Sequence, residues 1–269
     1  MQTITVSRKQ VNFEDYIKRP ASEKDFTNLI KEDTILFEEG NPKPILLFFK
    51  FTEDTSLVRQ AVQEIRYDTS ARSGGLMSTS RIFGFDPATG IRKPFCSATR
   101  LAMENPKQHK AIVDFGERIA KIYKEYLPDT YISHEQIAEE KVKKEWMIPL
   151  TPFTSGIINK NNQLNYHFDS GNFESVYSNM IVFKNNVSGG YLALPEFDMG
   201  LQCGDNTLVM FDGQKILHGV TPIHYYSEKA FRYSIVYYTL QQFWKCEEIN
   251  LEIAKVRNRR MRQERKNAK

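Results

Sequence analysis

Hydrophobic residues change their spacing near the middle of the chain, and the change predicts two kinds of structure. In the first half, apolar residues recur every three or four positions. This spacing predicts helices over Asp54–Ile65, from Asn105 to Pro128, and over His134–Trp146. A continuous apolar run, Ile45–Phe49, predicts a buried strand.

After residue 149 the pattern changes to short apolar runs separated by turns rich in glycine and asparagine. Many short strands at this spacing predict a double-sheet jelly roll, so we expect an α+β protein with a cupin-like core and supporting N-terminal helices. We expect three parts: a helical or mixed N-terminal elaboration (1–149), the jelly-roll core (150–245) and a basic C-terminal segment (246–269). The predicted strands are Thr154–Ile158, Asn165–Asp169, Ser178–Phe183, Tyr191–Leu194, Thr207–Phe211 and Ser234–Leu240.

Composition argues against several classes of protein. The chain has 269 residues and no apolar run long enough to span a bilayer, so no membrane association is expected. Its N-terminus lacks a basic region followed by an apolar one, which predicts no secretory signal and an intracellular location. The three cysteines, Cys96, Cys203 and Cys246, are odd in number and far apart. They argue against a disulfide framework and against a cysteine-based zinc site.

The charge of the chain is concentrated at its C-terminal end. The formal net charge is +4, but Glu252–Lys269 holds eight Lys and Arg against two Glu, a net charge of +6. The remainder of the chain therefore carries about −2. Such a segment can be a solvated helix end or a disordered terminus, and it can equally be an arm that binds phosphates.

Residues with the chemistry of a metal site lie in the second half of the chain. His167 and Asp169 form a His-x-Asp motif on a predicted strand, where residues two apart point to the same face. His218 follows on another strand. Two imidazoles and one carboxylate form the facial triad of non-haem Fe(II) oxygenases, which leaves metal positions open for a co-substrate and O₂. Arg232 offers a planar fork for the far carboxylate of 2-oxoglutarate, and Ser234 lies on the same face.

Other features of the chain have a structural and a functional interpretation. A His-x-Asp tripeptide occurs by chance in many proteins, and the three metal-ligand candidates could form an ordinary polar network. His224 is a rival for His218, but its loop-like context places it on the surface, and surface positions are also expected for His109 and His134. The segment Thr69–Phe85 reads as a surface loop followed by a strand, or as a loop that brings arginines close to a phosphate or carboxylate.

These residues resemble the TET/JBP group of Fe(II)- and 2-oxoglutarate-dependent dioxygenases, and most closely its compact phage and algal homologues. The similarity covers mainly Arg72–Phe85 and Thr151–Leu240. The cysteine-rich zinc-binding region of the animal members is absent. The resemblance implies roles for the following residues: iron ligation by His167, Asp169 and His218, a 2-oxoglutarate clamp at Arg232 with Ser234, contacts to the target base by Asn172 and Tyr238, and substrate contacts by Arg72 and Arg81.

The resemblance also implies an activity. The group oxidises the 5-methyl group of pyrimidines in nucleic acid, so we expect hydroxylation of 5-methylcytosine, in preference to thymine, in DNA. A stacked base is out of reach of an enclosed metal, so the pyrimidine must be flipped or single-stranded. Fe(II), 2-oxoglutarate and O₂ are the expected cofactor and co-substrates. Two alternatives stay open: an oxygenase acting on a protein side chain or small metabolite, and a non-catalytic jelly-roll binding protein.

Overall fold

The computed structural model describes residues 1–71, 75–91 and 93–267, and the chain separates into two compact units. Three segments form unit 1 and three form unit 2, so the chain passes between them several times. The sequence-based division into 1–149, 150–245 and 246–269 stays a prediction, and the compact units cut across its boundaries. Unit 1 comprises Met1–Arg81, Ile157–Ser170 and Glu174–Tyr237, and unit 2 comprises Ile82–Gly156, Gly171–Phe173 and Tyr238–Lys269.

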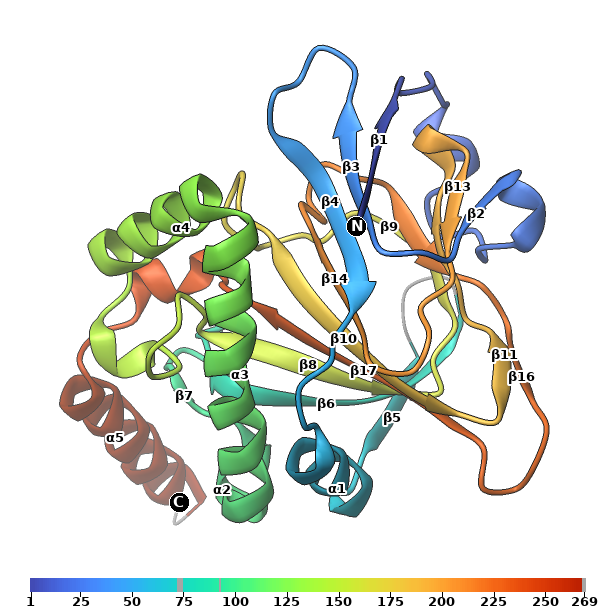
Figure 1. The fold of residues 1–269 in the computed structure, drawn as a ribbon. Coiled ribbons are helices and arrows are strands. Elements are labelled where there is room, and N and C mark those ends of the chain that lie inside the picture. The colour runs from blue at the N-terminus through green and yellow to red at the C-terminus, as the bar shows by residue number, and fades with distance from the viewer. Residues whose placement is uncertain (72–74, 92, 268–269) are drawn as a thin grey trace. The chain divides into compact units, whose positions relative to one another are not determined.

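The strands of the chain form two main β-sheets (Figure 1). The larger sheet has the order β1 (Gln2–Val6), β3 (Thr34–Glu38), β4 (Pro44–Lys50), β14 (Thr207–Phe211), β10 (Ser178–Asn185), β17 (Phe231–Tyr238), β8 (Ser155–Lys160), β6 (Met77–Asp86) and β5 (Asp68–Ala71), with β7 (Ser97–Ala98) on β6. The smaller sheet has the order β2 (Asn28–Ile30), β13 (Met199–Leu201), β12 (Leu192–Leu194), β15 (His218–Val220) and β9 (Leu164–His167). A short pair, β11 (Val187–Gly189) with β16 (Ile223–Tyr225), lies outside both sheets.

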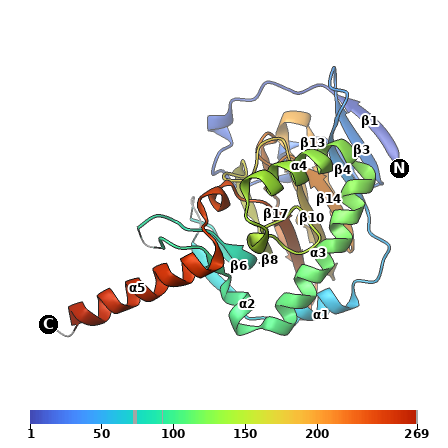
Figure 2. The ribbon, with the colours of Figure 1, turned by 90° about the vertical axis from the view of Figure 1, so that its left-hand side faces the viewer.

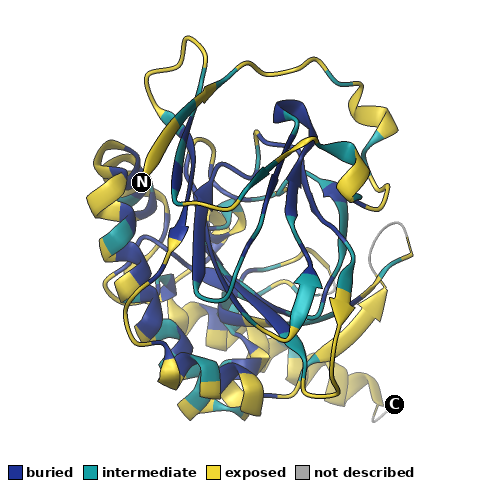
Figure 3. Cartoon of the chain, turned by 45° about the vertical axis from the view of Figure 1, so that its right-hand side comes forward, coloured by how far each residue is buried: buried dark blue, intermediate teal, exposed yellow. Residues whose placement is uncertain are grey.

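The core of unit 1 lies between these two sheets. Met180 and Val182 are alternate residues of β10, and they belong to the same buried cluster as Leu192 and Val220 from the smaller sheet. Most strand residues of both sheets are buried, as the dark segments of Figure 3 show. Two sheets packed on one apolar core form the two layers of a jelly roll, and with the helices of the chain they agree with the predicted α+β fold class.

Sequence spacing predicted the strands of the second half better than those of the first. Thr207–Phe211 has the predicted bounds, and the other predicted strands differ by a few residues at their ends. Residues 1–40, by contrast, contribute β1, β2 and β3, for which no element was predicted. β1 pairs in parallel with β3, and β2 pairs in parallel with β13. A partner as distant as Met199 is invisible to local pattern.

Helices contribute most of unit 2. The predicted helix from Asn105 corresponds to α3 (Pro106–Tyr126), which buries Ile112, Phe115 and Ile119 on one face. Pro128 begins the next helix, α4 (Pro128–Lys141), because proline is well suited to the first helical position. The expected helix His134–Trp146 was therefore wrong in its bounds: α4 starts earlier and ends earlier. Two shorter helices are α1 (Ser56–Glu64), in unit 1, and α2 (Arg100–Glu104).

Two histidines were wrongly expected on the surface. His134 is fully buried in unit 2, where its Nε2 lies 2.8 Å from the Thr239 hydroxyl. Its ring packs among Tyr123 and Phe153, and burial lowers the pKa of His134 to about 3. His109 is half-buried and accepts the Gly84 N–H at 3.0 Å. Both serve packing and hydrogen bonding within unit 2. His224 is exposed, as predicted, although it lies in β16.

The cysteines also correct the sequence-based expectation. Cys96 and Cys246 form a disulfide across 150 residues of sequence, with their Cα atoms 5.8 Å apart, while Cys203 is free and buried. Separation along the chain says little about separation in the fold, so the argument against a disulfide failed. The basic C-terminal segment, for which the sequence left a helix end and a disordered terminus open, forms α5 (Ile249–Asn267), one uninterrupted helix (Figure 2). Among the helices of the described residues, none has the length and apolarity to cross a bilayer.

Candidate active site

Unit 1 brings His167, Asp169 and His218 together, and we call these residues the metal triad. Their potential ligand atoms all lie within 4.8 Å of one another. Asp169 Oδ1 is 3.7 Å from His167 Nε2 and 3.8 Å from His218 Nε2. The two imidazole centroids are 4.4 Å apart, because His167 on β9 is the register partner of His218 on β15. Strand pairing in the smaller sheet thus places two residues that are 51 positions apart in the sequence directly opposite each other.

Main-chain contacts orient the two imidazoles of the metal triad. His167 Nδ1 lies 2.8 Å from the Asn165 carbonyl oxygen, and His218 Nδ1 lies 2.8 Å from the Ile216 carbonyl oxygen. A carbonyl can only accept, so each Nδ1 carries the proton and each Nε2 keeps its lone pair. This is the tautomer that a metal needs, held by the usual partner of a metal-binding histidine.

The carboxylate of the triad depends on a glycine. The Asp169 N–H donates to the Gly213 carbonyl at 2.8 Å, so the two backbones approach closely. A Cβ at Gly213 would lie 2.2 Å from Asp169 Oδ2, a separation that real atoms do not tolerate. On the other side, the Ser178 hydroxyl lies 3.3 Å from Asp169 Oδ2. Any side chain at Gly213 would therefore move the carboxylate away from the two histidines.

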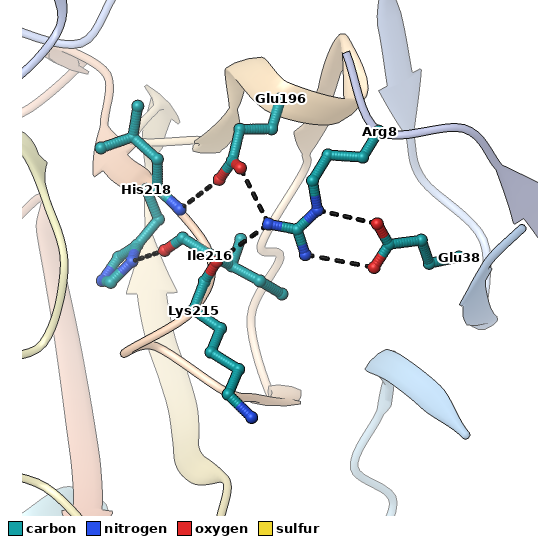
Figure 4. Close-up of polar contacts among 7 residues, drawn as sticks. Arg8, Glu38, Glu196, Lys215, Ile216 and His218 are labelled. Carbon is teal, nitrogen blue, oxygen red and sulfur yellow. Dashed lines mark hydrogen bonds and ion pairs between the residues drawn. The ribbon is translucent and has the colours of Figure 1, made fainter. Parts of the chain in front are cut away.

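A buried carboxylate holds the backbone that leads into His218 (Figure 4). Glu196 is 1% exposed and accepts the Leu217 N–H at 2.6 Å through Oε2. Its other oxygen accepts from Arg8 Nη1 at 2.8 Å, and the same Nη1 reaches the Lys215 carbonyl at 3.0 Å. Glu38 binds the opposite side of the guanidinium through both carboxylate oxygens, at 2.8 Å and 3.2 Å.

This network gives a task to the N-terminal strands. Arg8 follows β1, and Glu38 ends β3, so two elements with weak sequence signals together fix the segment that leads into a metal ligand. The carboxylate of Glu196 is stable in the interior because the Arg8 guanidinium neutralises it. Neither residue was predicted. The only local signal is an acidic residue, Glu196, within an otherwise apolar run.

Arg232 lies on β17 and is 1% exposed. Val236, on the same face of β17, packs against the core between the two sheets, so the alternation of the strand directs Arg232 into that space too. The His218 ring packs against Phe211, a member of the same core cluster, with the two ring centroids 4.9 Å apart. Nε and Nη2 of Arg232 find no hydrogen-bond partner among the described residues.

Among the described residues, no carboxylate is close enough to Arg232 to stabilise its charge. Burial lowers the pKa of the guanidinium, and only Cys203 and Tyr225 act in the opposite direction. An arginine keeps its proton at neutral pH, and an unpaired buried cation is costly. Gly190 allows the approach, since a Cβ there would lie 2.9 Å from Arg232 Cδ and Nε. A buried guanidinium with free donors fits a carboxylate ligand.

Ser234 belongs to a buried polar network beside Arg232. Its hydroxyl lies 3.3 Å from Asn159 Nδ2, and Asn159 Oδ1 accepts from Asn162 Nδ2 at 3.1 Å. Asn162 also donates to the Ser78 hydroxyl at 2.9 Å. The network joins strands of the larger sheet through buried amides, which sequence analysis had treated only as turn residues.

A pocket of about 390 Å³ borders His167. Its lining includes Ile17, Leu76, Asn165 and Phe168. Asn165 lies two residues before His167 on β9, and both residues line this pocket. Both polar atoms of its side chain are enclosed and make no hydrogen bond in the described part of the chain. An amide with two unused groups beside a metal ligand is a candidate for ligand contact that sequence analysis missed.

The remaining predicted residues have separate outcomes. Arg81 is buried on β6 and pairs with Asp68 at 2.6 Å, so its charge is neutralised within its own hairpin. Arg72 lies outside the described residues. Asn172 and Tyr238 belong to unit 2, where Asn172 is buried and forms a bridge with Leu240. Contact of Asn172, Tyr238 or Arg81 with a substrate stays a prediction.

A jelly roll that carries two imidazoles and a carboxylate in one cluster, together with a buried arginine, is typical of Fe(II)- and 2-oxoglutarate-dependent oxygenases. The comparison with known families narrows this class. The Tet_JBP family, described as the oxygenase domain of the 2OGFeDO superfamily, matches residues 82–241, which is more than half of the chain. The chain therefore belongs to the Tet_JBP family of oxygenase domains, which confirms the family assigned from the sequence.

Individual relatives support the same assignment. The bifunctional helicase and thymine dioxygenase JBP2 of Trypanosoma brucei brucei is 28% identical over 230 residues, covering 81% of this chain and 20% of that protein. Thymine dioxygenase JBP1 of Trypanosoma brucei brucei is 25% identical over 162 residues, covering 59% of this chain and 19% of that protein. This chain thus spans about a fifth of the length of these relatives.

Solved structures agree on the fold. The structure described as NgTET1 in complex with 5mC DNA has a TM-score of 0.57 at 14% identity, covering 85% of this chain and 90% of that chain. An oxidoreductase of the 2OG-Fe(II) oxygenase family from Burkholderia pseudomallei has a TM-score of 0.50 at 11% identity, covering 73% and 86%. At these identities the likeness concerns the fold alone.

Proposed function

We propose that this chain is an Fe(II)- and 2-oxoglutarate-dependent dioxygenase that hydroxylates the 5-methyl group of a pyrimidine in DNA. The observation that carries the proposal is the buried guanidinium of Arg232: its Nε and Nη2 have no hydrogen-bond partner among the described residues, and it shares a face of β17 with Val236, which packs against the core. A metal triad alone fits many ions. A triad with an enclosed cation fits a metal whose second ligand is a dicarboxylate.

In this proposal each residue of the site has one task. His167, Asp169 and His218 hold Fe(II) through two nitrogens and one oxygen. Arg232 pairs with the far carboxylate of 2-oxoglutarate, with Ser234 beside it. The bound metal and co-substrate supply the oxidation, in which 2-oxoglutarate, O₂ and a methyl group give succinate, CO₂ and a hydroxymethyl group. The apolar core around Arg232 and His218 excludes water from this reaction.

The substrate is proposed from the family and its relatives. The JBP proteins that match most of this chain are named thymine dioxygenases, so thymine now stands before 5-methylcytosine as the base. Asn172 and Tyr238 are proposed to contact that base, as the family resemblance implies. The base must leave the helical stack to reach an enclosed metal, so single-stranded or flipped pyrimidine is the proposed form. An intracellular location, where DNA is found, accompanies this proposal.

The test uses two oligonucleotides and the full chain reconstituted anaerobically with Fe(II). One oligonucleotide carries 5-methylcytosine, and the other carries thymine as its only methylated base. After exposure to 2-oxoglutarate and air, nucleosides are measured by mass spectrometry and succinate is measured in parallel. We expect a hydroxymethyl nucleoside from at least one oligonucleotide, and none from His167→Ala. Succinate without a modified nucleoside would keep the oxygenase and reject DNA as the substrate.

A further inference from the structure

The helix α5 is fixed at its beginning and exposed along the rest of its length. Glu252, which is 2% exposed, accepts the N–H groups of Cys96 at 3.0 Å and Glu247 at 2.8 Å. The disulfide between Cys96 and Cys246 lies just before the helix. These contacts are all within unit 2. They hold the first turn in place, and the following turns continue from it as one helix (Figure 2).

One face of α5 presents four cations to a groove. Lys255, Arg259, Arg262 and Lys266 follow each other at intervals of four, three and four residues, which places them on one side of the helix. All four line a groove of about 660 Å³ whose other wall includes Ile91 and Pro94. Eleven residues of helix span about 16 Å, comparable to roughly five base-pair steps of duplex DNA.

Most of these cations have no acidic partner. Lys255 is paired with Glu252 at 2.7 Å. Arg259 donates to the Ile91 carbonyl at 3.3 Å, which orients it along the groove without neutralising it. Arg262 and Lys266 are exposed and have no carboxylate partner within the described residues. Like charges three and four residues apart destabilise a helix, so this face favours a bound polyanion.

The other side of α5 provides an internal comparison. Arg257 and Arg260 lie outside the groove lining, and Arg260 is paired with Glu264 at 3.0 Å. If positive charge served only solubility, the two sides would be equivalent. The groove instead combines unpaired guanidinium groups, an oriented arginine and a concave surface, which are features that recognise phosphates.

We propose that the groove-facing side of α5, formed by Lys255, Arg259, Arg262 and Lys266, binds the phosphate backbone of substrate DNA. This inference rests on the proposed function and deepens it, because it assigns DNA a docking surface in unit 2. Contacts of this kind position the nucleic acid without reading its sequence. The groove therefore contributes affinity that falls with salt and that is the same for any base sequence.

The test compares two double variants that remove the same charge from opposite sides of one helix. Arg259→Gln with Arg262→Gln changes the groove, and Arg257→Gln with Arg260→Gln is the matched control. Binding of a fluorescein-labelled duplex is measured by anisotropy in the full chain at several salt concentrations. We expect the groove variant to bind about 10-fold more weakly and to lose roughly 2 from the slope of log K against log salt. Circular dichroism checks that both variants keep the helix.

Two results would overturn the proposal. Equal losses in the two variants would show that only total charge matters, and an unchanged affinity in the groove variant would exclude the groove. Failure of the proposed function looks different. In that case the wild-type chain yields no hydroxymethyl nucleoside from the same duplex, whatever its binding. A normal product yield at saturating DNA, together with unchanged binding in the groove variant, would reject the groove and keep the activity.

Discussion

The metal triad and Arg232 are prepared in opposite ways. Around the triad, the main chain and neighbouring side chains satisfy the parts of each ligand that do not face the metal: carbonyls hold the Nδ1 atoms of His167 and His218, and a glycine leaves room for Asp169. Around Arg232, burial is complete but Nε and Nη2 are unpaired within the described residues.

The difference indicates what each region is built to receive. A group whose outer atoms are satisfied is oriented in advance, and its remaining lone pair can meet a cation. A buried cation without a partner is costly until an anion arrives. The triad is therefore already oriented to bind a metal cation. The hydrogen-bond donors of Arg232, by contrast, are satisfied only when an anionic ligand binds.

The largest effect is expected from Gly213→Ala. The new Cβ would lie 2.2 Å from Asp169 Oδ2, so the carboxylate must move. A displacement of about 1 Å can lower turnover on the order of 100-fold, and we expect that loss together with weaker Fe(II) binding. Gly204→Ala is the control, since its nearest contact is the Thr207 hydroxyl at 3.3 Å. Unchanged Fe(II) affinity in Gly213→Ala would contradict the role assigned to the close approach.

Removing the buried carboxylate behind His218 is expected to have a smaller effect. Glu196→Ala frees the Leu217 N–H and leaves Arg8 without its buried partner. Partners of this kind typically contribute 10- to 100-fold in metal affinity, and we expect about 10-fold, measured by competition with a metal chelator. Glu196→Gln can still accept the Leu217 N–H, so this variant should keep more of the metal affinity than Glu196→Ala does. Glu38→Gln, altered on the exposed side of Arg8, should change little. Equal losses in all three variants would indicate general destabilisation.

Asn165→Ala should separate activity from stability. The amide of Asn165 makes no hydrogen bond in the described part of the chain, so its removal should leave the unfolding midpoint unchanged. Because Asn165 lines the pocket beside His167, we expect turnover to fall by about 10-fold through loss of one ligand hydrogen bond. A lower midpoint with normal turnover would show that the residue is structural.

A pH effect is expected from His134, the buried base of unit 2. Burial lowers the pKa of His134 from its ordinary value of 6.5 to about 3, so the folded chain excludes a proton that the unfolded chain binds. Stability contributed by the neutral ring is present above about pH 6.5 and is lost as pH falls toward 3, at up to roughly 1.4 kcal/mol per pH unit. His134→Gln should flatten this dependence in urea unfolding measured from pH 7 to pH 4. An unchanged slope would contradict it. Arg232 cannot be buried as a neutral group in this way, because an arginine keeps its proton at neutral pH.

Local pattern predicted the elements whose partners lie nearby or whose chemistry is contained in a few residues. Short segments of sequence show both the alternation of a strand and the donor atoms of a ligand. They therefore predicted the jelly roll, the strand Thr207–Phe211, and the metal triad with Arg232 as candidate residues. Contacts between segments that are distant in the sequence could not be predicted from local pattern. Arg8 meets Glu196 across 188 residues, and no periodicity relates them.

Packing decided the other errors. The burial of His134 and the disulfide of Cys96 with Cys246 both depend on which segments the fold brings together. The polar surroundings of His134 in the sequence wrongly predicted a surface position, and the wide separation of the cysteines wrongly argued against a disulfide. Pro128 was ambiguous in principle, because proline both ends one helix and suits the first position of the next.

The most direct measurement of the central claim is titration of 2-oxoglutarate into the anaerobic Fe(II)-loaded chain, by calorimetry, with wild-type protein and Arg232→Leu. We expect the variant to bind 2-oxoglutarate about 100-fold more weakly, which corresponds to roughly 2.7 kcal/mol, while its Fe(II) affinity is unchanged. Equal affinity of the two proteins for 2-oxoglutarate would contradict it. The unpaired guanidinium would then have no connection with the co-substrate.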